Sequence, residues 1–163
     1  VHQQVVDSSG TVTAAGVATV DGDVDDGFGS DPTGVEFKGL RVGMSASRTR
    51  RFTPDDVADY LRLVADPNPL YRAAQPELPP SLLGGIVSAL LGVDLPGYGT
   101  MWLKQHDRFH SPVSTPAEIV TTVTITGIRP EKGLVNLAYR SMSGSRLAAS
   151  GESLVLATDV APR

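Results

Sequence analysis

The sequence predicts an α+β domain in which an antiparallel sheet wraps around one long buried helix. The helix is predicted over residues 82–91, inside an uncharged run whose apolar residues do not keep to one stripe. A helix that is apolar all round is expected to be buried all round, so we expect almost no solvent exposure there. From Gly99 onward the chain turns to β-branched, alternating segments, which are typical of strands.

An amphipathic helix is predicted before the buried one. Thr53 is a candidate N-cap, and Pro54 occupies the first helical position. Asp55 and Asp56 follow in the first turn, where carboxylates complement the helix dipole. Because prolines follow soon after Ala65, the helix is expected to end near that residue.

Five strands are predicted around the two helices. The strongest signal is residues 118–128, where β-branched side chains alternate with few interruptions. The predicted strands are residues 42–52, 99–111, 118–128, 133–141 and 147–158.

Composition limits the classes of function. The chain has 163 residues, no cysteine and a formal net charge of −4. Disulfides and thiolate metal sites are therefore excluded, and no basic face predicts nucleic-acid binding. With no signal peptide or membrane span visible, we expect a cytoplasmic protein without a membrane partner.

Residues 1–34 are predicted to be a flexible acidic leader, rich in Gly and Asp, ahead of a domain over residues 35–163. The alternating aspartates from Asp21 suggest a calcium loop. The sixth and twelfth positions of that loop are Asp26 and Pro32 instead of glycine and glutamate, so the calcium interpretation fails. A flexible segment fits better, because few side chains here could offset the entropy of ordering.

The most specific motif is the loop over residues 65–71, Ala-Asp-Pro-Asn-Pro-Leu-Tyr. Two prolines stiffen the backbone directly after the amphipathic helix. Asp66 and Asn68 are either turn formers or members of a functional site, and composition alone leaves both open.

This loop and the uncharged run resemble the MaoC-like, R-specific enoyl-CoA hydratases. The family signature is similar to Gly-Asp-x-Asn-Pro-Leu-His, and residues 88–92 with 95–97 resemble its buried helix and exit loop. The resemblance covers residues 36–158. It implies a hotdog fold, usually a homodimer, with an acyl-thioester site between the long helix and the sheet.

The resemblance also implies roles for single residues. Asp66 takes the place of the catalytic aspartate that activates water, and Tyr71 stands where the family has histidine. Phenol has a reference pKa of about 10, against about 6.5 for imidazole, so Tyr71 is a poorer proton carrier that can still donate a hydrogen bond. Pro80 falls near the oxyanion glycine and lacks an N–H, which leaves the N–H of Ser81 as the substitute. The candidate substrate-binding residues are Asn68, Ser81, Ser88 and Leu103.

Asp107 is a third candidate catalytic residue. It shares an alternating set with Phe109, which is expected to face the helix, so Asp107 either points inward or is turned to solvent by a bulge. His106 and His110 belong to the opposite set and are expected on a solvated outer face.

The arginines and the histidines bear on phosphate and metal binding. The arginines at positions 48, 50 and 51 either lie on a solvated strand face or bind the phosphates of a carrier or coenzyme. No metal site is predicted, since the two histidines are too far apart to chelate one ion. No cofactor is expected either.

The sequence therefore predicts a dehydratase or hydratase acting on an acyl thioester or a polyketide-like intermediate, with Asp66 as general base. The acyl group of the substrate is carried by CoA, by a carrier protein or by neither. The rivals are a cyclase or double-bond isomerase of polyketide-type biosynthesis, a thioesterase, and a non-catalytic acyl-binding module.

Overall fold

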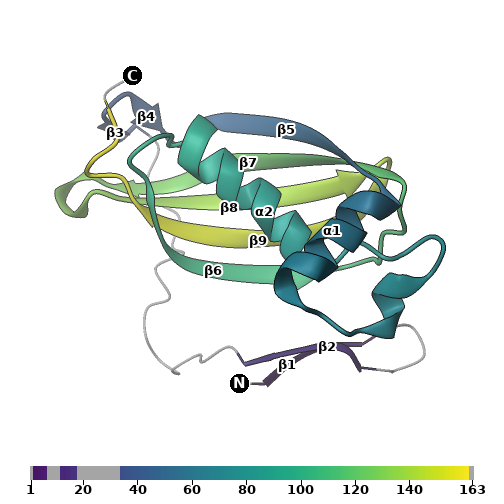
Figure 1. Ribbon diagram of the computed structural model, residues 1–163. Helices are drawn as coiled ribbons and strands as arrows, with labels where there is room; N and C mark the ends of the chain where they lie inside the picture. The colour runs from purple at the N-terminus through teal and green to yellow at the C-terminus, as the bar shows by residue number, and fades with distance from the viewer. Residues whose placement is uncertain (1, 7–11, 18–33, 162–163) are drawn as a thin grey trace.

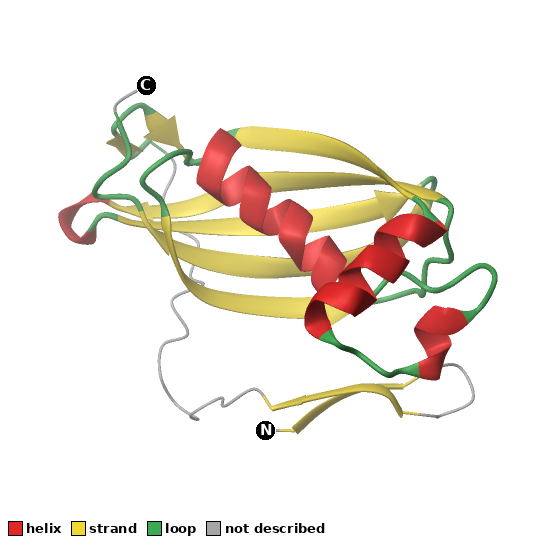
Figure 2. Cartoon of the chain, viewed as in Figure 1, coloured by secondary structure: helices red, strands yellow, loops and turns green. Residues whose placement is uncertain are grey.

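The computed structural model describes residues 2–6, 12–17 and 34–161. Its main feature is a five-stranded antiparallel sheet with one helix lying across a face of it (Figures 1 and 2). This arrangement confirms the predicted α+β class. In sheet order the strands are β5 (Ser45–Phe52), β7 (Ala117–Arg129), β8 (Leu134–Ser143), β9 (Arg146–Leu156) and β6 (Met101–Phe109), and the helix is α2 (Pro80–Ala89).

The core lies between α2 and the sheet. Leu83, Ile86 and Val87 of α2 belong to one buried cluster with the inward side chains of the sheet, among them Val123 and Leu137. Cross-strand register places Ala46, Val123, Tyr139, Gly151 and Asp107 along one row of this inner face. All five strands were predicted, with ends that differ by a few residues.

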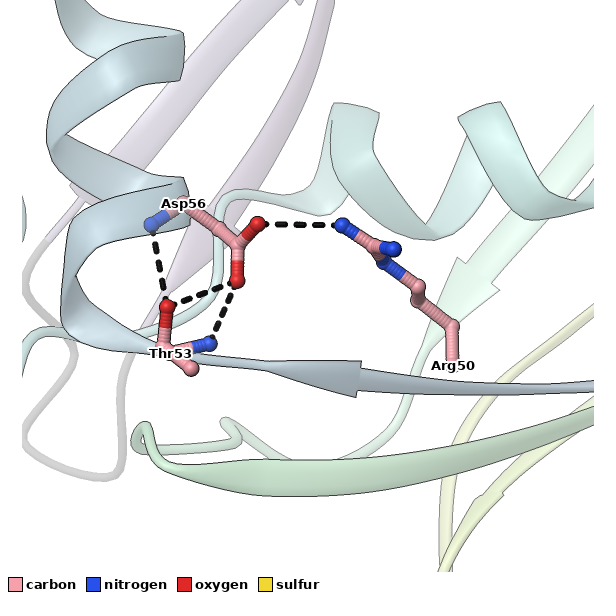
Figure 3. Close-up of polar contacts among 3 residues, drawn as sticks. All are labelled: Arg50, Thr53 and Asp56. Atoms are coloured by element: carbon pink, nitrogen blue, oxygen red, sulfur yellow. Dashed lines mark hydrogen bonds and ion pairs between the residues drawn. The ribbon is translucent and has the colours of Figure 1, made fainter.

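Helix α1 (Pro54–Val64) begins at Thr53, as predicted. The hydroxyl of Thr53 accepts a hydrogen bond from the Asp56 amide at 3.3 Å, and the Thr53 amide donates to the Asp56 carboxylate at 2.8 Å (Figure 3). Donation from Thr53 is the main reason that the pKa of Asp56 is lowered, and Arg50 at 3.0 Å adds to it. The reciprocal bonds form a capping box that fixes where the helix starts. The helix ends at Ala65, whose φ of 53° is left-handed.

The long helix, predicted over residues 82–91 with almost no solvent exposure, differs from the prediction in where it ends and in its burial. First, α2 ends at Ala89 and continues as one π-helical turn, η2 (Leu90–Asp94). Second, Ser81, Gly85 and Ser88 are exposed in the single chain. They follow one another at spacings of four and three residues, so they share one face. An open sheet covers only one side of a helix, and small residues occupy the side that faces away.

Several short elements were not predicted. Backbone pairing joins β1 (His2–Val6) to β2 (Val12–Val17), and β3 (Glu36–Phe37) to β4 (Leu40–Arg41). The predicted leader is thus partly paired backbone, while its acidic run over residues 21–32 lies outside the described residues. The leader and its boundary stay predictions. The remaining short elements are the 3₁₀ turns η1 (Pro69–Arg72) and η3 (Pro130–Lys132).

The arginine cluster of β5 is largely used in ion pairs. Arg48 contacts Asp94 of η2 at 2.5 Å, and Arg50 contacts Asp56 of α1 at 3.0 Å. These pairs connect β5 to both helical segments, which favours a structural role over phosphate binding. Within the described ranges, no helix combines the length and the apolar character needed to cross a membrane.

Replacing Thr53 by Ala is expected to lower the free energy of unfolding by about 1 kcal/mol, because one half of the capping box is lost. Ser145→Ala, at an exposed hairpin turn, is the matched control and should change stability by less than about 0.5 kcal/mol. Chemical denaturation of both variants measures the difference. Equal stabilities would show that the cap contributes nothing.

Candidate active site

A hollow of about 560 Å³ lies between α1 and the loop that leads from it toward α2. Both Asp66 and Tyr71 line it, so the structure brings together the two residues at the centre of the predicted site. Leu61, Arg62, Arg72 and Pro76 are also among its lining residues. With Asp55 at its other side, the hollow therefore has two acidic groups, two guanidinium groups and an apolar wall.

The loop geometry orients Asp66. Its Oδ1 accepts a hydrogen bond from the Asn68 amide at 2.9 Å, and the Asn68 side-chain oxygen accepts from the Leu70 amide at 3.1 Å. Both residues therefore form turns, and Asp66 also lines the hollow, so the two alternatives do not exclude each other. Among the described residues, the Asn68 amide is the one donor to the Asp66 carboxylate, so Oδ2 keeps its capacity to accept a proton.

Tyr71 is nearly buried, with 9% of its surface exposed. Burial is the main cause that raises the pKa of its phenol, and the charges of Asp66 and Glu77 raise it further. A phenol whose pKa is above its ordinary value stays protonated at neutral pH. Tyr71 is thus a hydrogen-bond donor in this hollow and is poorly suited to act as a base.

The rear of the hollow is anchored to the sheet. The carbonyl of Pro76 accepts hydrogen bonds from the amide and the hydroxyl of Thr115, at 2.9 and 3.0 Å. Two residues later, the Leu78 amide donates to Val113 at 2.7 Å. Because residues 113–115 follow shortly after β6, the wall of the hollow is connected to the end of that strand.

The other predicted binding residues are not part of this hollow. The Ser81 hydroxyl lies 2.5 Å from the Tyr60 hydroxyl, and Ser88 is on the exposed face of α2. Leu103 lines a separate hollow on β6. In the single chain, α1 and its own loop enclose Asp66, and the roles of Ser88 and Leu103 in substrate binding stay predictions. Asn68 stays next to the hollow through its bond to Asp66.

Asp107 faces the helix-covered side of the sheet, which decides between its two open alternatives. Its Oδ1 accepts hydrogen bonds from the Tyr139 hydroxyl, at 2.5 Å, and from the Gln105 amide. The bulge at Leu103 does exist, but it lies before Gln105 and leaves Asp107 inward. His106 and His110 are exposed, as predicted. Sequence reasoning missed Tyr139, because only the pairing of β8 with β9 and of β9 with β6 reveals its position beside Asp107.

The chain is similar to known enzymes over most of their length. It is 33% identical over 126 residues to an (R)-specific enoyl-CoA hydratase of Aeromonas caviae. The aligned region covers 71% of this chain and 94% of that protein. The solved structure of the (R)-hydratase from A. caviae superposes with a TM-score of 0.66, at 34% identity over 71% of this chain and 96% of that one. An R-hydratase of Pseudomonas aeruginosa gives a TM-score of 0.67 at 25% identity, over 72% of this chain and 82% of that one. No family model matches the sequence.

The fold is the hotdog fold, and the similarity to enoyl-CoA hydratases identifies an enzyme of the hydro-lyase class. The chain belongs to the MaoC-like, (R)-specific enoyl-CoA hydratase family.

The raised pKa of Tyr71 can be measured by comparing phenolate absorbance in the wild type and in Tyr71→Phe. The absorbance lost in the variant should belong to a group that ionises above pH 10, because burial and the charge of Asp66 both oppose the phenolate. Since the folded-state pKa is raised, Tyr71 stabilises the fold below pH 10 and this contribution is lost as pH rises through the folded pKa. If the absorbance lost in Tyr71→Phe belongs to a phenol that titrates at or below pH 10, Tyr71 is not in a buried site beside the charge of Asp66.

Proposed function

We propose that this protein adds water to, or removes water from, an acyl thioester, with Asp66 as the general base and Tyr71 as a hydrogen-bond donor to the substrate. The observation that carries the proposal is the shared hollow of Asp66 and Tyr71 at the end of α1. Family membership supports the reaction class, since its relatives include a 3-hydroxybutyryl-CoA dehydratase of Methylorubrum extorquens at 27% identity over 128 residues.

In the hydration direction, Asp66 accepts a proton from water while the water oxygen forms a bond to the β-carbon of the enoyl group. The double-bond electrons move toward the thioester carbonyl and give an enolate. The proton held by Asp66 then passes to the α-carbon, which regenerates the carboxylate and completes the addition of one water molecule. One carboxylate thereby serves both proton transfers, in keeping with a phenol at position 71 that stays protonated.

The thioester oxygen needs a donor when the enolate forms. Pro80 at the first turn of α2 has no N–H, and the first N–H groups of a helix lack partners within the helix. The Ser81 amide is the first such group after Pro80. We assign it the role of oxyanion donor, which requires the thioester group to extend beyond the residues that line the Asp66 hollow, because Ser81 is not one of them.

The same carboxylate supports a second candidate reaction. A single base can also move a double bond or catalyse intramolecular addition of a hydroxyl to an enoyl group, and Tyr71 in place of imidazole favours chemistry with one base. This protein is then an isomerase or cyclase acting on a polyketide-like chain, carried by CoA or a carrier protein. Chromatography of reaction mixtures distinguishes a hydrated product from an isomer or ring of unchanged mass.

We also propose that the protein is a homodimer formed through the free edge of β6. Met101, Trp102 and Leu103 are 58%, 37% and 47% exposed on this edge strand. An exposed strand edge with apolar side chains is a template for pairing with a second chain.

The catalytic assignment is tested with Asp66→Asn, which keeps the side-chain shape and removes the base. Hydration of crotonyl-CoA, followed as loss of enoyl absorbance, should fall by about 10²- to 10⁴-fold. Tyr71→Phe should lose less, because only a hydrogen bond to the substrate is removed. Glu131→Gln, which removes an exposed carboxylate of η3, is the control and should retain wild-type turnover. Full turnover by Asp66→Asn would exclude Asp66 as the base.

The dimer is tested by Leu103→Lys, which places a charge at the proposed interface. Sedimentation should show a dimer for the wild type and a larger monomer fraction for the variant. Val120→Lys, on β7 three strands away from β6, should remain dimeric. A monomeric wild type, or equal association of both variants, would contradict an interface at β6.

A further inference from the structure

The Asp107 cluster is an unusual feature of the inner face of the sheet. Tyr139 is 3% exposed and Ser153 is 1% exposed, and both take part in hydrogen bonds around Gln105 and Asp107. The surrounding core is built from aliphatic side chains of α2 and the sheet. Removing polar and charged groups from water costs free energy unless they are paired, so this cluster reduces stability unless its bonds or its function compensate.

The bonding of Asp107 is one-sided. The hydroxyl of Tyr139 and the side-chain amide of Gln105 both donate to Oδ1. Within the described part of the chain, no residue donates to Oδ2. The carboxylate is therefore held in one orientation by one oxygen, while its other oxygen remains an acceptor on the helix-covered side.

The donors that hold Asp107 are themselves fixed. Burial is the main cause that raises the pKa of Tyr139, and the hydrogen bond to Asp107 raises it further, so the phenol stays protonated. Gly151 provides room for the ring, because a Cβ at that position would lie 2.6 Å from Tyr139 Cε1. The Gln105 side-chain oxygen accepts from Ser153 and, at 3.2 Å, from the indole N–H of Trp102.

One member of the cluster, Gln105, lines open space at the β6 edge. This space is a hollow of about 270 Å³, which Trp102, Leu103 and Lys104 also line. Asp107 is two residues from the end of β6, and residues 113–115 that follow this strand hold the wall of the Asp66 hollow. Pairing of a second copy at the β6 edge leaves Gln105 and Asp107 on the helix-covered side.

We propose that Asp107, held by Tyr139 and Gln105, is a specificity determinant that accepts a hydrogen bond from a hydroxyl group on the acyl chain of the substrate. The inference rests on the proposed function, because it assumes that an acyl chain extends from the Asp66 hollow along the inner face of β6. The substrate class is then a hydroxylated acyl thioester. A plain hydrocarbon chain at this place would bury Oδ2 without a partner, which disfavours its binding.

Binding of saturated acyl-CoA esters tests this without any turnover. Calorimetry with the wild type compares hexanoyl-CoA with three analogues that carry a hydroxyl on the fourth, fifth or sixth carbon. At least one analogue should bind about tenfold more tightly than hexanoyl-CoA, as expected for a hydrogen bond to a charged group. Equal affinity for all four esters would overturn the inference, and the cluster would then be structural only.

Two variants locate the preference. Asp107→Leu should lose the preference for the hydroxylated ester and bind hexanoyl-CoA at least as well as the wild type. Tyr139→Phe keeps the Asp107 carboxylate but removes one of the two hydrogen bonds that orient it. The preference of this variant for the hydroxylated ester should therefore be reduced. His106→Ala, on the outer face of the same strand, is the matched control and should keep the full preference. A preference that survives in a folded Asp107→Leu would overturn the assignment to Asp107.

The two proposals fail in different ways. If no enoyl thioester is hydrated or formed by dehydration, the proposed function is contradicted, while the binding preference is still measured. If crotonyl-CoA is hydrated but hydroxylated and plain chains bind equally, only the role of Asp107 is contradicted.

Discussion

The packing of α2 against the inner face of the sheet is the constraint on which the rest of the structure depends. Val87 and Leu90 are fully buried there, as are Ile119 and Val123 of β7. Because one helix covers five strands, every inward side chain must be apolar or must find a polar partner within the cluster. The polar groups that remain on this face are therefore informative about function.

The position of the site follows from this packing. Helix α1 must end at Ala65 so that the chain can return to the start of α2, and the left-handed conformation of Ala65 makes the turn. Prolines at positions 67 and 69 then limit the paths that the loop can take. Asp66 lies between the helix end and these prolines, which fixes its carboxylate beside the wall at Pro76. A carboxylate at a helix C-terminus meets the unfavourable end of the dipole, so function is a better reason for its position than helix stability.

Local signals in the sequence were sufficient for much of the fold. The start of α1 depends on Thr53 and Asp56, which are three residues apart, and strands such as β7 are visible in their own alternation. Asp66 and Tyr71 could be paired because only four residues, two of them prolines, separate them. What could not be predicted depends on long-range pairing. The contact of Tyr139 with Asp107 requires the register of three strands, and the walls of the Asp66 hollow require the placement of α1 against its own loop.

The exposed side of α2 is a different kind of error. The spacing of Ser81, Gly85 and Ser88 is visible in the sequence, but the absence of charge in this run predicts burial on all sides. Small residues carry little information about burial, because they fit equally well under another chain or beside water.

The most direct test of the catalytic assignment is a crystal structure of this protein with its β-hydroxyacyl-CoA product. In the proposed mechanism the β-hydroxyl lies within hydrogen-bond distance, about 2.6–3.2 Å, of Asp66 Oδ2, and Tyr71 donates to the same ligand. A product whose β-hydroxyl lies outside the hollow of Asp66 and Tyr71 would contradict the account.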